Sequence, residues 1–252
     1  MSNTNPESKF VTKDLAAYEG LSVEEYTFCT LVNYHGEQQD YKLDVITRPA
    51  HGDTPRPVVI FAHGGGFVRP NDKRQGYIPV FAKALTLEGY AVVSPDYPVF
   101  DSNEHRATWN ETRGADRAAE ALFLTYQFAK ENAARFGFDT DRIAVMGGSA
   151  GGMACYYLLD HYDVNIRVFG NCWGASRLPL NNVAKFPPTV SIHGTADQSV
   201  DYALELPIHE ALDKAGIPNK LITLEGAGHT PMKLFSTYIS EVLAFMRTYM
   251  QA

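Results

Sequence analysis

Apolar and polar residues alternate along the chain with two different periods. Short runs of β-branched, aromatic and aliphatic residues are typical of strands, whereas apolar residues spaced three and four positions apart are typical of helices. The strand pattern occurs at residues 25–33, 41–48, 57–62, 91–94, 142–146, 166–169, 189–192 and 220–224. The helix pattern occurs at residues 81–87, 113–136, 150–159, 202–215 and 232–250. This alternation predicts an α/β protein.

Strand–helix–strand units predict a mostly parallel sheet with helices on its faces. Residues 57–62 read PVVIFA, a continuous apolar run expected of a strand that is buried on both faces. The first two strands have no helix between them, so we expect them to form an antiparallel edge. The pattern therefore predicts one sheet of about eight strands, in which ligands bind beyond the carboxyl ends of the parallel strands.

The length of 252 residues fits one large domain, and no internal repeat or linker divides the chain. Residues 1–20 are polar, and we expect them to form an N-terminal arm or a partial cap over a pocket mouth. Residues 21–252 are expected to form a single α/β domain.

Composition and charge narrow the classes of function. Apolar residues make up 45% of the chain and charged residues 20%, which is ordinary for a globular protein. The net charge of −7 argues against nucleic acid or an anionic membrane as a partner. No apolar stretch approaches the roughly 18 residues of a membrane span, and residues 1–13 contain no apolar leader segment. The three cysteines do not have the spacing of metal ligands. We therefore expect them to be reduced thiols in a cytoplasmic protein.

A glycine-rich turn follows the strand predicted at 142–146 and precedes a helix. It reads GGSAGG at residues 147–152 and fits the pattern G-x-S-x-G of a nucleophile elbow. Gly147 and Gly151 are small enough for the strand and the helix to approach, and the turn exposes the Ser149 hydroxyl at a helix N-terminus. A phosphate-binding loop of the Walker type would need a lysine here, and none is present. We interpret Ser149 as a nucleophile.

A second glycine-rich segment, HGGG at residues 63–66, follows the strand predicted at 57–62. Glycines let the backbone approach a ligand closely, so that several amide groups can point at one oxygen atom. Acyl transfer needs two or three such donors around the oxyanion of the tetrahedral intermediate. We expect the amides of Gly65, Gly66 and Ala150 to form this oxyanion hole, with His63 as structural support.

A serine nucleophile needs a base that is oriented by an acid. Among the eight histidines, His229 combines a strand-end loop, GAGH at residues 226–229, with a position after an acid candidate. Asp197 ends the segment HGTAD at residues 193–197, which also closes a strand. The order Ser149, Asp197, His229 is the chain order of the triad in α/β-hydrolases. Asp201 and Glu225 are the alternative acids.

Taken together, the segments HGGG, GGSAGG, HGTAD and GAGH resemble those of a serine esterase of the α/β-hydrolase superfamily. The chain is most similar to carboxylesterases with an HGGG loop, including hormone-sensitive-lipase-like and feruloyl- or acetyl-xylan-esterase-like members. Gly148 departs from the Asp that hormone-sensitive-lipase relatives usually carry before the serine. The resemblance implies a catalytic α/β-hydrolase domain with a triad of Ser149, Asp197 and His229, and with no metal or cofactor.

The pocket walls and the substrate follow from the neighbours of these segments. Phe67, Trp173 and Leu178 are the candidate substrate-binding residues, since they lie next to the glycine loop or after the sixth strand. The stretch from 174 to 188 is short for a cap, so we expect an open site with a small or minimal cap that favours esters with short acyl groups. A homodimer through an edge strand or the last helix is left open.

Three other functions are weighed against the esterase. A serine peptidase of the prolyl-oligopeptidase type normally carries a propeller domain, and this chain has no blade repeat. An amidase such as a formamidase fits the same size and motifs. A non-catalytic ligand receptor usually loses the nucleophile or the base, and both residue types are present here.

Overall fold

The computed structural model describes residues 15–49, 54–101, 111–177 and 179–251, and most of the predicted N-terminal arm therefore lies outside the described residues. Its strands are β1 (Ser22–Val32), β2 (Gln38–Thr47), β3 (Arg56–Ala62), β4 (Ala91–Pro95), β5 (Phe138–Gly148), β6 (Val168–Cys172), β7 (Thr189–Gly194) and β8 (Asn219–Leu224). Its α-helices are α1 (Ile78–Leu87), α3 (Glu111–Glu131), α4 (Ala133–Phe136), α5 (Ala150–His161), α6 (Leu206–Lys214) and α7 (Phe235–Met250). Short 3₁₀ helices are η1 (Leu15–Tyr18), η2 (Val183–Lys185), η3 (Tyr202–Leu204) and η4 (Met232–Leu234).

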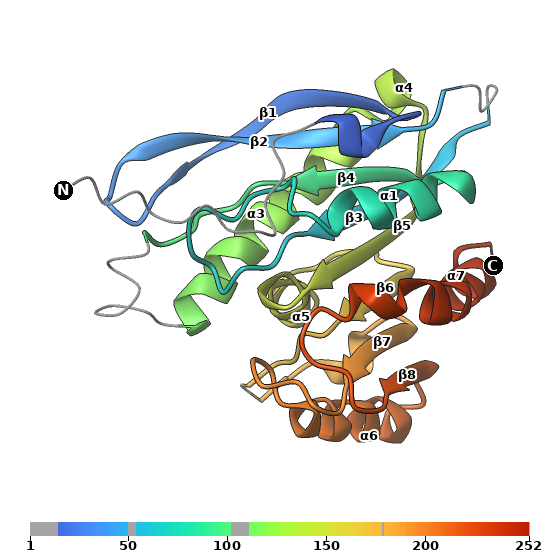
Figure 1. Cartoon of the computed structure of the whole chain (residues 1–252). Coiled ribbons are helices and arrows are strands. Elements are labelled where there is room, and N and C mark those ends of the chain that lie inside the picture. Colours follow the sequence, from blue (N-terminus) through green and yellow to red (C-terminus); the bar gives the residue numbers. More distant parts are fainter. Residues whose placement is uncertain (1–14, 50–53, 102–110, 178, 252) are drawn as a thin grey trace.

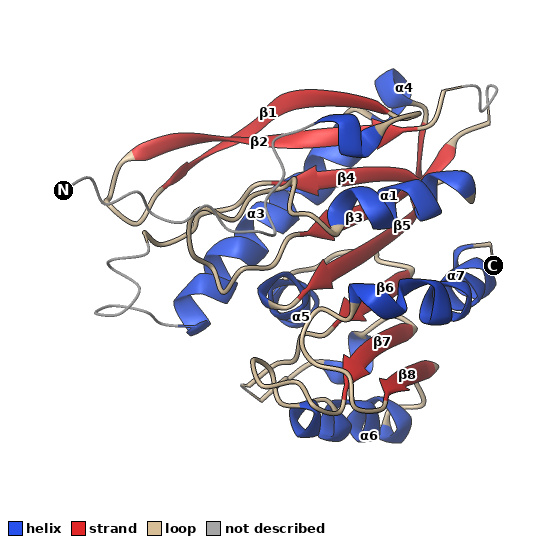
Figure 2. Ribbon diagram, in the orientation of Figure 1, coloured by secondary structure: helices blue, strands red, loops and turns tan. Residues whose placement is uncertain are grey.

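The strands form one eight-stranded sheet in the order β1-β2-β4-β3-β5-β6-β7-β8. From β4 to β8 every pairing is parallel, whereas β1 pairs with β2 and β2 with β4 in the antiparallel sense. The predicted sheet and its antiparallel edge are thus confirmed. Figure 2 shows the sheet running through the molecule with helices on either side.

Helices cover both faces of the sheet, and two apolar cores separate them from it. One core joins the sheet to α3, α5 and α6, and the other joins it to α1, α7 and η1. Figure 1 shows the labelled α-helices around the sheet. The central strand β3 contributes to both, since Val58 and Ile60 belong to the first core and Val59 and Phe61 to the second. This alternation is the two-residue period of a strand buried on both faces, as the run PVVIFA predicts.

Several predicted boundaries differ from the structure. The helix predicted at 113–136 is interrupted at Asn132, and the left-handed Gly137 (φ 63°) ends α4, so that β5 begins at Phe138 rather than at residue 142. The strand predicted at 166–169 is β6, which extends to Cys172. The helices predicted to begin at 202 and 232 both start with a 3₁₀ turn. Among the described residues, no helix has the length and apolar character needed to cross a bilayer.

Candidate active site

The carboxyl ends of the parallel strands lie side by side, so the loops that follow them meet at one edge of the sheet. Ala62 of β3 pairs with Gly147 of β5, and Gly148 pairs with Cys172 of β6. Farther along the sheet, Gly194 of β7 pairs with Leu224 of β8. The segments HGGG, GGSAGG, HGTAD and GAGH all leave the sheet at these ends, which explains how residues far apart in the sequence reach one site.

Ser149 lies in a sharp turn between β5 and α5. Its backbone has φ 55° and ψ −120°, a conformation that a residue with a side chain rarely adopts, and it precedes the first residue of α5. A Cβ atom on Gly147 would lie 2.3 Å from the backbone of Gly151, and one on Gly151 would lie 2.3 Å from the carbonyl oxygen of Ala62. The small residues on both sides of the serine are therefore required by close backbone contacts.

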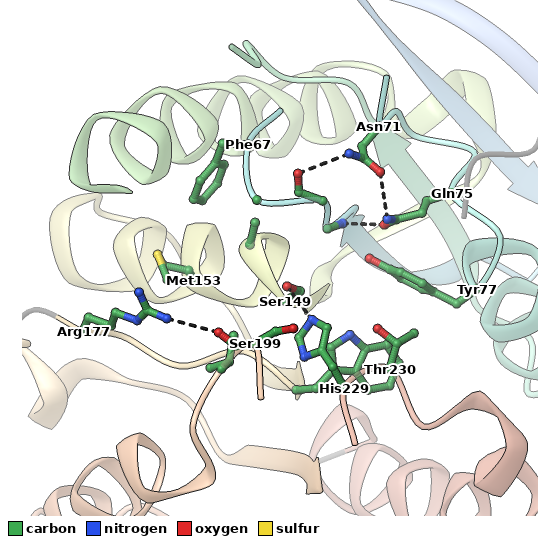
Figure 3. A pocket seen from close by; sticks show the side chains of 16 residues that line it. Phe67, Asn71, Gln75, Tyr77, Ser149, Met153, Arg177, Ser199, His229 and Thr230 are labelled. Atoms are coloured by element: carbon green, nitrogen blue, oxygen red, sulfur yellow. Dashed lines mark hydrogen bonds between the residues drawn. The ribbon is translucent and has the colours of Figure 1, made fainter. Parts of the chain in front are cut away.

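A chain of hydrogen bonds joins Ser149, His229 and Asp197 (Figure 3 shows the first two). His229 Nε2 is 2.9 Å from Ser149 Oγ, and His229 Nδ1 is 2.7 Å from Asp197 Oδ2. Because a carboxylate only accepts hydrogen bonds, Nδ1 carries the ring proton. Nε2 is then left to accept the hydrogen bond of the Ser149 hydroxyl. The structure brings together the three residues that the sequence predicts.

The Asp197 carboxylate is buried and surrounded by N–H groups. Its Oδ1 accepts from the amides of Ser199 (2.8 Å) and Val200 (3.0 Å), while its Oδ2 faces His229 and also His193 Nε2 at 3.3 Å. Burial by itself raises the pKa of this carboxyl, but the donors from His193, His229, Val200 and Ser199 outweigh it and hold the pKa of Asp197 well below its usual range. Asp197 is therefore ionised at neutral pH.

The two alternative acids have other partners. Asp201 caps η3 by accepting from the amide of Ala203 at 2.9 Å, and Glu225 accepts from the Thr195 hydroxyl at 3.2 Å. The same Thr195 hydroxyl accepts from the amide of Gly226 at 2.9 Å. Thr195 thus ties the loop after β7 to the loop after β8, and this tie fixes the acid relative to the base.

The loop after β3 borders the same cavity as Ser149. The amide of Gly64 is already bound by Gln75 Oε1 at 2.7 Å. Gly65 and Gly66 follow with φ values of 99° and 62° and line the same cavity as Ser149. Ala150 is the first residue of α5, so no helical carbonyl reaches its amide. The three predicted donors therefore border one cavity together.

Asn71 and Gln75, which the sequence analysis missed, brace this loop. Asn71 Nδ2 donates to the carbonyl oxygen of Val68 at 2.7 Å. It also donates to that of Gly65 at 3.2 Å, and Gln75 Nε2 donates to Asn71 Oδ1 at 3.3 Å; Figure 3 shows these last two bonds. A Cβ atom on Gly65 would lie 2.1 Å from Asn71 Cγ, so a glycine is required at 65 as long as Asn71 occupies this place.

The cavity at the strand ends has a volume of about 380 Å³. Of the predicted wall residues, Phe67 and Trp173 line it, whereas Leu178 lies outside the described residues. Lining residues that the sequence analysis missed are Asn71, Gln75, Tyr77, Met153, Arg177, Ser199, Val200 and Thr230. Most of these residues lie in irregular loops, where the sequence has no helical or strand periodicity that would indicate which side chains face the cavity.

His63 is buried beneath the glycine loop and does not join the hydrogen-bonded triad. Its ring stacks on Tyr97 with 4.0 Å between centroids, and its Nδ1 is 2.9 Å from the carbonyl oxygen of Gly64. Burial lowers the pKa of His63 to about 4, so the ring is neutral near pH 7. Within the described residues, no group of His, Cys, Asp and Glu side chains is arranged to hold a metal ion.

Comparison with known proteins identifies relatives by sequence. Residues 43–159 match the family model BD-FAE. Human hormone-sensitive lipase is 28% identical over 173 residues, which cover 68% of this chain and 14% of the lipase. Esterase LipC of Mycobacterium tuberculosis is 34% identical over 118 residues, or 47% of this chain and 26% of LipC. The chain thus spans about a quarter or less of the length of these curated relatives.

Solved structures share the fold at low sequence identity. MGS-M1, an α/β hydrolase from a deep-sea metagenome library of the Medee basin, has a TM-score of 0.72 and 20% identity, and the match covers 93% of this chain and all of that one. Esterase 2 of Thermogutta terrifontis phosphorylated by paraoxon has a TM-score of 0.67 and 19% identity, with 90% and 94% covered. The chain has the α/β-hydrolase fold, and parts of its sequence are similar to hormone-sensitive lipase and to the BD-FAE family model.

Proposed function

We propose that this member of the α/β-hydrolase superfamily is a serine ester hydrolase that acts through an acyl-enzyme on esters with short acyl groups. The observation that carries the proposal is the chain of hydrogen bonds from Ser149 through His229 to Asp197, at the edge of a cavity bordered by backbone amides. Relatives named esterase and lipase support the same reaction class.

In the proposed mechanism, His229 Nε2 takes the proton of the Ser149 hydroxyl as Ser149 Oγ attacks the ester carbonyl carbon. The negative charge that develops on the carbonyl oxygen is stabilised by the amides of Gly65, Gly66 and Ala150. Protonated His229 then gives its proton to the leaving alcohol, and the acyl group stays on Ser149 as an ester.

The acyl-enzyme is hydrolysed by the same groups. Water loses a proton to His229 Nε2 as its oxygen attacks the acyl carbon, and the proton returns to Ser149 when the acid leaves. Throughout, ionised Asp197 holds the proton of His229 on Nδ1 and stabilises the imidazolium. The chain's own residues supply every group that these steps use.

The preference for short acyl groups rests on the size of the cavity and on the connection between β6 and β7. A cavity of about 380 Å³ is at the small end of ligand pockets. The described part of the connection between β6 and β7 contains only η2, the turn Val183–Lys185, and no inserted helical cap.

Hydrolysis of p-nitrophenyl esters from acetate to palmitate, with Ser149→Ala and His229→Ala alongside, tests the proposal. We expect the acetate and butyrate esters to be cleaved fastest, and each variant to lose on the order of 10⁶ in kcat. Paraoxon, which phosphorylates the Thermogutta esterase, should label wild-type Ser149 in a mass spectrum and should not label Ser149→Ala. A folded wild-type protein that cleaves none of these esters would refute the proposal, and faster cleavage of palmitate would refute its substrate range.

A further inference from the structure

A second histidine lies against the acid of the triad. His193 is the residue before the last of β7, and its side chain is fully buried. Its Nε2 is 2.9 Å from the carbonyl oxygen of Val200 and 3.3 Å from Asp197 Oδ2. A carbonyl oxygen only accepts hydrogen bonds, so His193 Nε2 must carry a proton. One N–H group therefore serves both the loop backbone and the carboxylate.

The contacts of His193 close the loop that carries Asp197. Val200 donates its amide to Asp197 Oδ1 and accepts from His193 with its carbonyl, while Ser199 donates a second amide to the same oxygen. Ser199 and Val200 also line the cavity. His193 therefore ties this loop to β7, a strand in which every residue is buried.

We propose that His193 is a positioning residue for hydrolysis. Its Nε2–H group fixes the loop of residues 197–200 and partly compensates the negative charge of Asp197 that acts on His229. This inference rests on the proposed function, because it assigns His193 a part in setting the basicity of His229.

The surroundings of His193 keep that N–H group in place. The buried carboxylates of Asp197 and Glu205 attract a positive charge, and the Tyr202 ring lies edge-on at 5.8 Å. Burial opposes protonation, but the hydrogen bonds to Asp197 and Val200, with the attraction of Glu205, raise the pKa of His193 overall. A second proton would go to Nδ1, so Nε2 carries its proton in either charge state.

The sign of the effect on His229 follows from electrostatics. Without the His193 N–H group, the charge on Asp197 is less compensated and stabilises the imidazolium of His229 more strongly. The acid limb of the kcat/KM profile, which reports the base of the free enzyme, then moves to higher pH. The loop also loses its anchor, so kcat falls while KM for a small ester changes little.

Two substitutions of His193 by amide side chains of different length distinguish a positioning role of its Nε2–H group from a role in packing alone. The Nε2 of Gln in His193→Gln extends to the place of the ring Nε2, whereas the shorter Asn in His193→Asn does not. We expect His193→Asn to lower kcat by about 10-fold to 100-fold, the effect of one hydrogen bond to a charged group, and to raise the acid-limb pKa. His193→Gln should restore most of both. His161→Gln, on the exposed end of α5, is the matched control.

The inference is overturned if His193→Asn and His193→Gln lose activity equally and the acid limb of the kcat/KM profile stays at the same pH in both. It is also overturned if neither variant loses activity. If neither variant folds, the tautomer of His193 in the wild-type protein decides, measured by ¹H–¹⁵N correlation spectra. A proton on Nε2 supports the inference, and a proton on Nδ1 alone overturns it. Absence of ester hydrolysis by the wild type would instead refute the proposed function, and the tautomer would still be measurable.

Discussion

Asn71 shows how a side chain outside the triad determines the shape of the site. Its amide bridges the carbonyls of Gly65 and Val68 and meets Gln75, which in turn holds the amide of Gly64. These bonds hold the backbone of the loop that carries Gly65 and Gly66. A donor placed for a developing oxyanion acts only if its direction is fixed before the reaction.

Replacing Asn71 by leucine, which has the same number of heavy atoms and the same branching at Cγ, removes these hydrogen bonds. We expect Asn71→Leu to lower kcat by about 10-fold to 100-fold on p-nitrophenyl acetate, somewhat less than the loss of an oxyanion donor itself. KM should change little, since the amides act on the transition state. Asn165→Leu, at an exposed position, is the control. A loss confined to KM would contradict the assignment.

Residues at the ends of regular elements could be predicted from the sequence, and those within irregular loops could not. Ser149, Asp197 and His229 follow strands whose apolar runs are visible, so their convergence at one edge of the sheet follows from topology. Asn71 and Gln75 lie in a segment between β3 and α1 that has no period. Their contacts depend on how that segment folds back over the glycine loop.

At the scale of elements, the turn between β5 and α5 depends on two backbones in contact. A methyl group on Gly147 would meet the carbonyl carbon and oxygen of Gly151 at 2.3 Å. Neither element has room to retreat, because Gly147 pairs with Ala62 of β3 and α5 is buried along almost its whole length. The strained backbone of Ser149 is held between these fixed elements.

Gly147→Ala is therefore expected to destabilise the fold by about 3 kcal/mol, at the upper end of ordinary overpacking, and to abolish ester hydrolysis. Urea unfolding measures the first effect and the p-nitrophenyl acetate assay the second. Gly170→Ala on the neighbouring strand β6 is the matched control, because the atoms nearest to its methyl group would be side-chain atoms of Met146 rather than backbone atoms. Equal losses of stability in the two variants would show that the backbone contact does not govern the turn.

The boundaries of elements were harder to predict than their existence. The helical pattern at 113–136 continues across Asn132 because apolar residues keep their spacing, yet Gly137 adopts a left-handed conformation and the chain turns into β5. The same limit applies to the helices that begin with η3 and η4. Apolar spacing determines which face is buried, whereas the first and last turns depend on local hydrogen bonds.

At the scale of the whole molecule, the sequence predicts the parallel sheet and its antiparallel edge but not the order of the strands. In the sheet β4 lies between β2 and β3, and the chain then crosses to β5 on the other side of β3. This change of direction leaves the loops after β3 and β5 adjacent, which is where ligands bind in open α/β sheets. Placement of the site is therefore a property of the topology as a whole.

Burial of ionisable groups couples the folding of the whole molecule to pH. His63, 1% exposed, has its pKa lowered by burial to about 4, whereas in the unfolded chain its pKa is near 6.5. Between these values the unfolded chain binds a proton that the folded protein does not. His63 therefore contributes a loss of stability as pH falls from about 6.5 to about 4, amounting to about 3 kcal/mol at the lower end.

The contribution of His63 is isolated by comparing the wild type with His63→Phe, which keeps an aromatic ring against Tyr97 but does not titrate. His193 and His209 have raised pKa values and act in the opposite direction, stabilising the fold below about pH 6.5, but they are the same in both proteins. We expect the wild type to lose more unfolding free energy than His63→Phe when urea titrations are moved from pH 7 to pH 4. A difference between the two proteins that stays constant with pH would mean that His63 is protonated as readily in the folded protein as in the unfolded chain. That outcome would contradict its buried, neutral place beneath the glycine loop.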